Sequence, residues 1–566
     1  MQDDDRRDRG LGRGARASGA ARLGLRAFVR TGEPVDVEEV PSAAKKVVAT
    51  NAQGATVRAA TDRSDSALCL APGTWQVEAV DASGAVLAEE IVTVGAHPAE
   101  RPVHAFVTSF GPGSARASLE WLISLRATVV QFYDWMATYC APVGPGSQWQ
   151  DPSQRPVARS TLEELARVVR AQGGIALAYA PVYAADLGYA AAHPEQMLYR
   201  GDGQMERLFD AIKLANPADV RWQEQFLAAY GNAAEELGFN GFHLDTYGFP
   251  RAALDAGGGP VRMLCAYEAF LDAVRASRPE DTISFNQVNG APSAVRLPRG
   301  PSIRYCEVWP PNHAWRHLEA FVDRTSGRSG RLAGRAGPTS DQPVRGSLAC
   351  YPPVWGRPGE ALPAERRLDA LRTVVSTEAI ATMLGVSVLV HGDQRAVLSD
   401  PYYPQHESLM ALEASTVLDW HRFALRCRDL FLDGEDTSWY EIGDDNGAVS
   451  VTWDGPVYPE PVGGAVFARV VSTDDYVAVG ALDLSGSAAG RWSETTASGE
   501  CRGVRVRILR DRPERWEAAG AVLGHRDGRF VPLGARTVEH REGLALEVEL
   551  PVVSGWSILR LVPRRS

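Results

Sequence analysis

The sequence predicts a multidomain protein in which a central (β/α)8 barrel stands between two β-rich domains. A chain of 566 residues is long enough for three or four domains of about 150 residues each. Short apolar strands alternate with helical periodicities over 102–430, the order expected of a parallel α/β fold. Strand-like alternation alone fills 33–101 and 431–566.

Eight apolar segments predict the strands of the barrel. They cover 104–110, 127–134, 175–183, 241–245, 282–287, 303–309, 347–351 and 387–392. Helical patterns lie between them, at 160–169, 218–237, 261–277 and 364–383. The first of these helices is expected to open with a capping box, Ser160-Thr-Leu-Glu163. A ninth short apolar segment around Lys213 is expected to belong to a loop excursion outside the barrel.

The flanking regions have the pattern of β-domains. Between residues 33 and 101, runs such as TWQVEAVD and AVLAEEIVTV alternate with turn residues at the spacing of a small β-sandwich. A second β-sandwich is expected over 431–566. Residues 1–32 are rich in arginine and poor in large apolar residues, so we expect a disordered arm there, with a basic anchor as the alternative.

Composition favours a neutral partner. The chain has 59 Lys and Arg against 70 Asp and Glu, a net charge of −11, which gives no general attraction to nucleic acid or anionic lipid. No apolar run reaches the ~18 residues of a membrane span. The seven cysteines are scattered and form no CxxC pair, so neither a disulfide framework nor a zinc site is expected. The start of the chain has no signal-like apolar segment, which favours the cytoplasm; no pattern indicates an oligomeric state.

Three acidic residues end predicted strands. Asp134 ends the second strand, Asp245 the fourth and Glu307 the sixth. Because the carboxyl ends of barrel strands meet at one mouth, we expect these acids to face a common site. Two carboxyl groups with unequal pKa values can cleave a glycosidic bond, one as nucleophile and the other as acid and base. The alternative is that each acid caps a helix or accepts loop hydrogen bonds.

Aromatic residues surround these acids in the sequence. Their flat faces would suit pyranose rings, although each could instead belong to the core. They are Tyr133, Trp135, Tyr179, Tyr183, Tyr247, Trp309 and Tyr351.

Five motifs occur in an order that is typical of one family. VQFYDW, LAYAPVYAA, GFNGFHLDTYG, SFNQVNG and YCEVW follow each other along the central region. With them, the chain resembles the dextranases and cycloisomaltooligosaccharide glucanotransferases of glycoside hydrolase family 66. The resemblance implies an immunoglobulin-like β-domain, a (β/α)8 catalytic barrel and a C-terminal β-sandwich over about 33–566.

The resemblance also implies roles for individual residues. Asp245 in FHLDTYG matches the family's nucleophile and Glu307 in YCEVW its acid/base, with retention of anomeric configuration. The family needs no cofactor, and the sequence contains no evident metal-ligand cluster. Further candidates for contacts with sugar lie in the same motifs: Asp134, His243, Asn286, Gln287 and Asn289.

Two departures from the family pattern concern the substrate pocket. After FYDW the family usually has a basic Arg-His pair, whereas this chain reads MATYC at 136–140. At the eighth strand the family's acidic pattern is replaced by SVLVHGD, so His391 and Asp393 are expected to line the pocket instead. The short segment between Tyr351 and Val386 leaves no room for an inserted carbohydrate-binding module, which favours hydrolysis over cyclisation.

The sequence therefore predicts a retaining hydrolase of the α-1,6 linkages of dextran or isomalto-oligosaccharides. The alternatives are a retaining hydrolase or transglycosylase for a different glycan, and a barrel that binds carbohydrate without catalysis. Related enzymes are often secreted, whereas the expected cytoplasmic location would suit an imported oligosaccharide as substrate.

Overall fold

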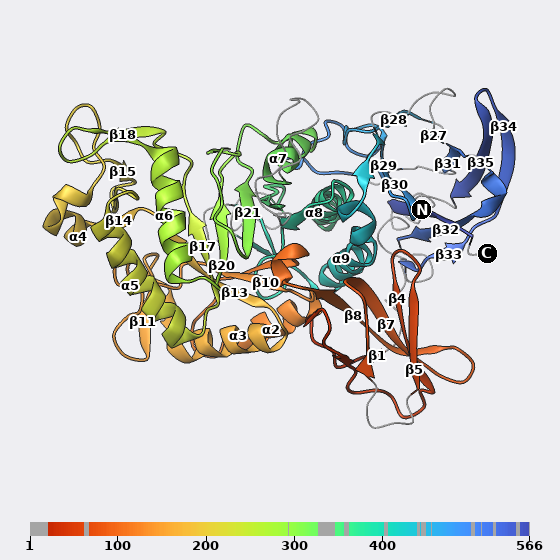
Figure 1. Ribbon diagram of the computed structural model, residues 1–566, viewed down its shortest axis with the longest axis horizontal. Coiled ribbons are helices and arrows are strands. Elements are labelled where there is room, and N and C mark those ends of the chain that lie inside the picture. Colours follow the sequence, from red (N-terminus) through yellow and green to blue (C-terminus); the bar gives the residue numbers. More distant parts are fainter. Residues whose placement is uncertain are drawn as a thin grey trace.

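The computed structural model places a parallel barrel beside two β-domains, which both lie to its right in Figure 1. It describes residues 21–60, 67–292, 294–326, 346–355, 362–400, 406–438, 442, 449–453, 455–497, 499, 504–510, 512–523, 528–550 and 555–564. Within these residues, no helix is both long enough and apolar enough to cross a membrane.

Eight parallel strands form the barrel, as predicted. They are β9 (His104–Val107), β10 (Val129–Phe132), β13 (Ile175–Pro181), β17 (Gly241–Asp245), β20 (Thr282–Asn286), β21 (Ser302–Glu307), β22 (Gly346–Ala349) and β23 (Ser387–Leu389). Each pairs with its neighbours in chain order. The last strand, β23, lies against the first, β9, so the barrel is nearly closed.

The helices predicted around the barrel are also present. They are α3 (Arg159–Ala171), α5 (Val220–Leu237), α6 (Met263–Ser277) and α8 (Ala364–Met383). The described chain adds α2 (Ala115–Ser124), α4 (Leu187–Ala192), α7 (Arg316–Ser326), α9 (Ala411–Leu432) and the 3-10 turns Pro98–Glu100, Pro194–Gln196 and Pro513–Arg515. The predicted capping box is wrong, because α3 begins one residue before Ser160 and its cap residue, Ala158, has no side chain that could accept a hydrogen bond.

Small antiparallel sheets are inserted after several barrel strands, at the carboxyl end. One pairs β11 (Gln148–Gln150) with β12 (Pro156–Ala158), and another joins β14 (Ala184–Asp186), β16 (Ile212–Leu214) and β15 (Arg207–Leu208). The segment around Lys213 is β16, outside the barrel, as expected. The remaining pairs are β18 (Ala252–Leu254) with β19 (Pro260–Arg262) and β24 (Ala396–Leu398) with β25 (His406–Ser408).

The N-terminal domain is built on a six-stranded sheet. Its strands are β1 (Ala21–Arg22), β2 (Phe28–Arg30), β4 (Lys46–Asn51), β5 (Thr56–Ala60), β7 (Gly73–Val80) and β8 (Val86–Gly95), and β3 (Val35–Asp36) pairs separately with β6 (Ala67–Leu68). The expected disordered arm is wrong for residues 21–32, because β1 and β2 pair with β8 and Leu23, Leu25 and Phe28 are buried. Residues 1–20 lie outside the described part, and the immunoglobulin-like assignment stays a prediction.

Two antiparallel-rich sheets make up the C-terminal domain. One contains β26 (Glu435–Asp436), β28 (Val457–Tyr458), β29 (Val466–Ser472), β30 (Val477–Asp483), β32 (Trp516–Val522), β33 (Val531–Pro532) and β36 (Trp556–Pro563). The other contains β27 (Val449–Thr452), β31 (Val504–Leu509), β34 (Ala535–His540) and β35 (Gly543–Leu550). Apolar side chains from both sheets, including Val470 and Val506, form one buried cluster between them.

Helix α9 ties the barrel to the N-terminal sheet through buried polar contacts. The Arg428 guanidinium donates hydrogen bonds to the hydroxyls of Thr74, over 3.0 Å, and Thr93, over 2.8 Å. Asp429 accepts a hydrogen bond from Arg101 over 2.8 Å. Because buried charges are costly without partners, these contacts fix how the two domains meet.

Candidate active site

Three adjacent strands end in polar side chains that touch one another. Asp245 ends β17, Asn286 ends β20 and Glu307 ends β21, and β20 lies between the other two. The Asn286 amide nitrogen lies 2.7 Å from Oδ1 of Asp245 and 3.0 Å from Oε2 of Glu307. Its amide oxygen accepts the backbone N–H of Glu307 over 3.3 Å, which fixes the orientation of the amide. One side chain therefore donates to both carboxylates.

This bridge limits the gap between the two acids. Because one nitrogen lies within 3.0 Å of each oxygen, the nearest carboxylate oxygens are separated by less than the ~6.5 to 9.5 Å typical of inverting glycosidases. Both acids are half-buried and line the same pocket. The predicted convergence of Asp245 and Glu307 at one mouth is therefore found in the structure.

Further donors hold each carboxylate in place. The Tyr179 hydroxyl donates to Oδ2 of Asp245 over 2.8 Å. The Tyr351 hydroxyl donates to Oε1 of Glu307 over 2.6 Å. The Trp309 indole N–H donates to Oε2 of Glu307 over 3.1 Å. With the Asn286 bridge, these contacts leave little rotational freedom to either acid, a geometry suited to positioned catalytic groups.

The two acids differ in what shifts their pKa values. Burial raises the pKa of Asp245, and hydrogen bonds from Asn286, Tyr179 and the Thr246 backbone oppose the rise. Burial, followed by the negative charge of Asp245, raises the pKa of Glu307 to about 7. Glu307 can therefore titrate near neutrality beside a second carboxyl group whose pKa is also raised.

The pocket in front of the acids contains seven of the predicted residues. They are Tyr133, Asp134, Tyr179, Asp245, Tyr247, Glu307 and Trp309. The Tyr247 and Trp309 rings meet edge to face, with centroids 5.8 Å apart. Such an aromatic wall beside paired carboxylates can hold a pyranose ring by its apolar face.

Asp134 lies in the same pocket in a strained backbone conformation, with φ of 50°. Its Oδ2 is 3.4 Å from Nη2 of Arg155. Burial raises the pKa of Asp134 to about 7, although the charge of Arg155 acts in the opposite direction. The pocket thus contains a third carboxyl group that can titrate near neutrality.

Several residues predicted to contact sugar instead support the pocket from behind. Trp135 is fully buried and its indole N–H donates to the Tyr179 carbonyl. Tyr183 is buried and its hydroxyl accepts the Tyr247 backbone N–H. His243 is buried within the barrel, hydrogen-bonded to Ser284. The expectation of direct contact is therefore wrong for these three, because neighbouring side chains cover them.

The residues that follow the neighbouring strands also have supporting positions. Gln287 is buried and donates to the Pro292 carbonyl, which removes it from the pocket. The Asn289 side-chain oxygen accepts the Trp309 backbone N–H over 2.8 Å. Tyr351 and the buried Asn286 reach the carboxylates themselves, as described above. Asn286 and Tyr351 thus belong to the site through the acids they bind.

The eighth strand does not supply the pocket contacts that its sequence suggested. His391 is buried beside Glu378 and His421, between α8 and α9. Asp393 is buried and accepts the backbone N–H groups of Thr108 and Ser109. The expectation that His391 and Asp393 line the pocket is therefore wrong.

The inserted sheets supply pocket residues that sequence reasoning missed. Phe209, between β15 and β16, lines the pocket and is 59% exposed. Tyr139, within the segment that departs from the family's Arg-His pair, lines it as well. Arg155, between β11 and β12, brings a basic group to Asp134 from a different loop. The one sequence signal for these residues was an aromatic residue, Phe209, close to the segment around Lys213 that was expected to lie outside the barrel.

A barrel whose strands end in two coupled carboxylates beside an aromatic pocket defines a class, the barrel enzymes that act on carbohydrate. Residues 72–556 match the family model described as glycosyl hydrolase family 66. Because this match covers most of the chain, the protein belongs to glycosyl hydrolase family 66.

Known relatives agree with membership of this family, and solved structures share the fold. A cycloisomaltooligosaccharide glucanotransferase of Niallia circulans is 24% identical over 283 residues, which cover 45% of this chain and 29% of that relative. The chain thus matches less than a third of the curated relative's length. A Paenibacillus cycloisomaltooligosaccharide glucanotransferase, solved with cycloisomaltoheptaose, has a TM-score of 0.74 at 16% identity and covers 96% of this chain and 99% of that one.

A more distant structure shares the fold. An α-amylase of Geobacillus thermoleovorans, solved with acarbose, has a TM-score of 0.51 at 9% identity, over 82% of this chain and 99% of that one. At these identities the two structures support the fold alone.

Proposed function

We propose that this protein is a retaining glycoside hydrolase that cleaves α-1,6-glucosidic linkages of dextran or isomalto-oligosaccharides. Asp245 acts as the nucleophile and Glu307 as the acid and base. The observation that carries the proposal is the Asn286 amide, which donates to both carboxylates at once. This bridge supports the close spacing, about 5 to 5.5 Å, that a retaining pair uses.

In the first step, an ionised Asp245 oxygen attacks the anomeric carbon of the bound sugar. The bond from that carbon to the glycosidic oxygen breaks, and Glu307 gives its proton to the departing oxygen. The raised pKa of Glu307, about 7, supports this role because a large fraction of the group then carries a proton near neutrality. The product is a glycosyl ester on Asp245.

In the second step, water replaces Asp245 at the anomeric carbon. Glycosylation removes the charge of Asp245, which is one of the two factors that raise the pKa of Glu307. The pKa of Glu307 therefore falls in the intermediate, and its carboxylate becomes a ready base for the incoming water. Two inversions at one carbon give net retention, and Glu307 regains its proton.

The choice of substrate rests on family membership and on the surroundings of the acids. The relatives and the solved neighbour are named cycloisomaltooligosaccharide glucanotransferases, which supports an isomaltose-type, α-1,6-linked glucan. The pocket walls include Tyr247, Trp309 and the exposed Phe209. Such aromatic faces suit a neutral sugar chain better than an ionic substrate.

Transglycosylation is the second candidate, favoured by the names of the same relatives. It uses the same glycosyl ester, with a sugar hydroxyl in place of water as acceptor. The two outcomes differ in product alone, so neither changes the roles of Asp245 and Glu307.

One experiment tests the reaction and the linkage together. Purified protein is incubated with dextran, isomalto-oligosaccharides and malto-oligosaccharides, and products are resolved over time by chromatography and by NMR of the anomeric protons. We expect cleavage of the α-1,6 substrates, with the α-anomer appearing first. A first-formed β-anomer contradicts retention, and exclusive cleavage of malto-oligosaccharides contradicts the linkage. Larger or cyclic products would favour transfer over hydrolysis.

Variants of the two acids test their roles. Asp245→Asn and Glu307→Gln should each lower turnover by at least about 1,000-fold. Glu120→Gln removes an exposed carboxylate from α2 and is a matched control that should keep full activity. With an activated substrate, azide should restore turnover to Glu307→Gln, because azide needs no base to attack the ester. Turnover retained in Asp245→Asn contradicts the assignment, and if no glycan is cleaved by the wild type the barrel only binds carbohydrate.

A further inference from the structure

A buried cluster of three ionisable side chains lies away from the carboxylate pocket. Glu378 comes from α8, His421 from α9 and His391 from the segment that follows β23. All three are buried. Oε1 of Glu378 is 2.5 Å from Nδ1 of His421 and 3.4 Å from Nε2 of His391. One potential ligand atom from each residue falls within 4.8 Å of the others.

The hydrogen bonding of His421 indicates which ring nitrogen could bind a metal ion. Its Nε2 is 2.8 Å from the backbone oxygen of Leu125 and must carry a hydrogen to bond there. Its Nδ1 faces Oε1 of Glu378 over 2.5 Å, in a hydrogen bond that a metal ion bound between them would replace. A histidine that donates its other N–H to a backbone carbonyl is the usual arrangement around a metal ion, because this bond fixes the tautomer and the ring orientation.

The cluster also has unsatisfied polar atoms. Among the described residues, Oε2 of Glu378 and Nδ1 of His391 are buried without a hydrogen-bond partner. Within the same residues, the ion pairs of Glu378 are with these two histidines, and no arginine or lysine reaches it. An ion bound at the cluster would give these buried oxygen and nitrogen atoms a partner.

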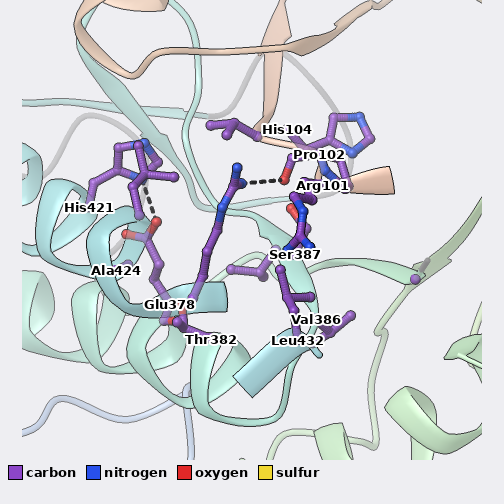
Figure 2. A pocket seen from close by; sticks show the side chains of 15 residues that line it. Arg101, Pro102, His104, Glu378, Thr382, Val386, Ser387, His421, Ala424 and Leu432 are labelled. Carbon is purple, nitrogen blue, oxygen red and sulfur yellow. Dashed lines mark hydrogen bonds and ion pairs between the residues drawn. The ribbon is translucent and has the colours of Figure 1, made fainter. Parts of the chain in front are cut away.

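A cavity gives access to this cluster. Glu378 and His421 line it together with residues at the start of β23, such as Ser387. Figure 2 shows the two side chains directed toward each other, His421 above Glu378, at one side of the cavity. None of the residues that line this cavity lines the pocket of Asp245 and Glu307. The cluster thus lies beside a cavity that is separate from the carboxylate pocket.

We propose that Glu378, His391 and His421 form a binding site for a divalent transition metal ion such as Zn²⁺. Two imidazole nitrogens and one carboxylate are a common protein ligand set for Zn²⁺, and water from the cavity would complete a tetrahedral shell. On binding, the ion would displace the hydrogens that the histidine nitrogens share with Glu378. It ties α8, α9 and the end of β23 together, so its role is structural.

Metal content and metal-dependent stability test the proposal. The full-length protein is purified, stripped with a chelator and dialysed, and then titrated with ZnCl2 or with CoCl2 as a spectroscopic probe. We expect one equivalent of tightly bound metal per chain, a Tm raised by about 3 °C or more on loading, and Co²⁺ absorption bands in the visible range that indicate tetrahedral coordination. Wild-type protein that stays folded and binds no stoichiometric metal overturns the proposal.

Matched variants assign the site. Glu378→Gln, His391→Gln and His421→Gln should each weaken binding by at least about 10-fold and abolish the rise in Tm. His193→Gln is the control, because His193 forms an exposed pair with Glu195 that could bind surface metal weakly. Loss of tight binding in the control, or unchanged binding in the double variant His391→Gln/His421→Gln, would place the metal elsewhere. Circular dichroism of each variant shows whether a loss of binding reflects unfolding, and the wild-type titration decides the question independently.

Discussion

The hydroxyl of Tyr351 lies 2.6 Å from Oε1 of Glu307 and donates a hydrogen bond to it. This bond stabilises the ionised carboxylate, so it lowers the pKa of Glu307 against the effects of burial and of Asp245. The proton affinity of the proposed acid is therefore set by several neighbours at once. Each of them can be removed separately.

Tyr351→Phe should move the alkaline limb of the pH–activity profile upward. Without the hydroxyl the ionised form of Glu307 loses a donor, so its pKa rises above its present value of about 7. The protonated acid then persists to higher pH. The pH dependence of kcat/KM measures the change, with Tyr199→Phe as a control because the Tyr199 hydroxyl bonds to the Pro194 carbonyl outside the site. A limb that stays in place shows that Glu307 does not control it.

Asp134→Asn should leave that alkaline limb near pH 7. The pKa values of Asp134 and Glu307 are both raised to about 7, mainly by burial, so either group could in principle produce the limb. We assign the limb to Glu307, because its protonated form donates the proton and is lost as the pH rises through its pKa. Profiles of kcat/KM for the variant decide between them. Disappearance of the limb would assign it to Asp134.

Asn286→Ala should lower kcat by about 100-fold, since its amide is the donor shared by both acids. Asn286→Asp should lower it further, because a third carboxylate raises the pKa of its neighbours. Because the side chain touches the carboxylates from behind, KM should change little. Steady-state kinetics, with circular dichroism to confirm folding, provide the test. A change confined to KM would indicate a role in sugar binding instead.

Phe209→Ala should raise KM by about 5-fold while kcat changes little. The ring is 59% exposed and lines the pocket, where it can stack on a sugar at a cost on truncation of roughly 1 kcal/mol. Leu412→Ala is the control, since Leu412 is also exposed but lies at the start of α9. Equal kinetics for Phe209→Ala and the wild type would show that this rim residue does not contact substrate.

Much of the fold and the two acids could be predicted from local sequence. Barrel strands are short buried runs, and residues that end parallel strands meet at one mouth whatever their sequence separation. Asp245 and Glu307 could be placed for that reason. The family resemblance then assigned roles that no single strand could show.

The other pocket residues, the first N-terminal strands and the buried cluster of Glu378 and two histidines depend on tertiary contacts. No local sequence pattern contains such contacts. Phe209 and Arg155 enter the site from inserted antiparallel sheets, whose return toward the barrel mouth is a matter of tertiary packing. Residues 21–32 have few large apolar side chains, so the sequence predicted disorder there. In the structure Leu23, Leu25 and Phe28 are buried, and β1 and β2 pair with β8. Glu378, His391 and His421 have no motif spacing, so the packing of α8 against α9 alone brings them together.

Trapping the glycosyl ester tests the central claim most directly. An activated, fluorinated α-glucosyl inactivator slows the second step, so the sugar remains attached to the nucleophile. After proteolysis, mass spectrometry should find the added sugar on the peptide that contains Asp245, and Asp245→Asn should remain unlabelled. A label on Glu307, Asp134 or another residue would contradict the proposed double displacement through Asp245.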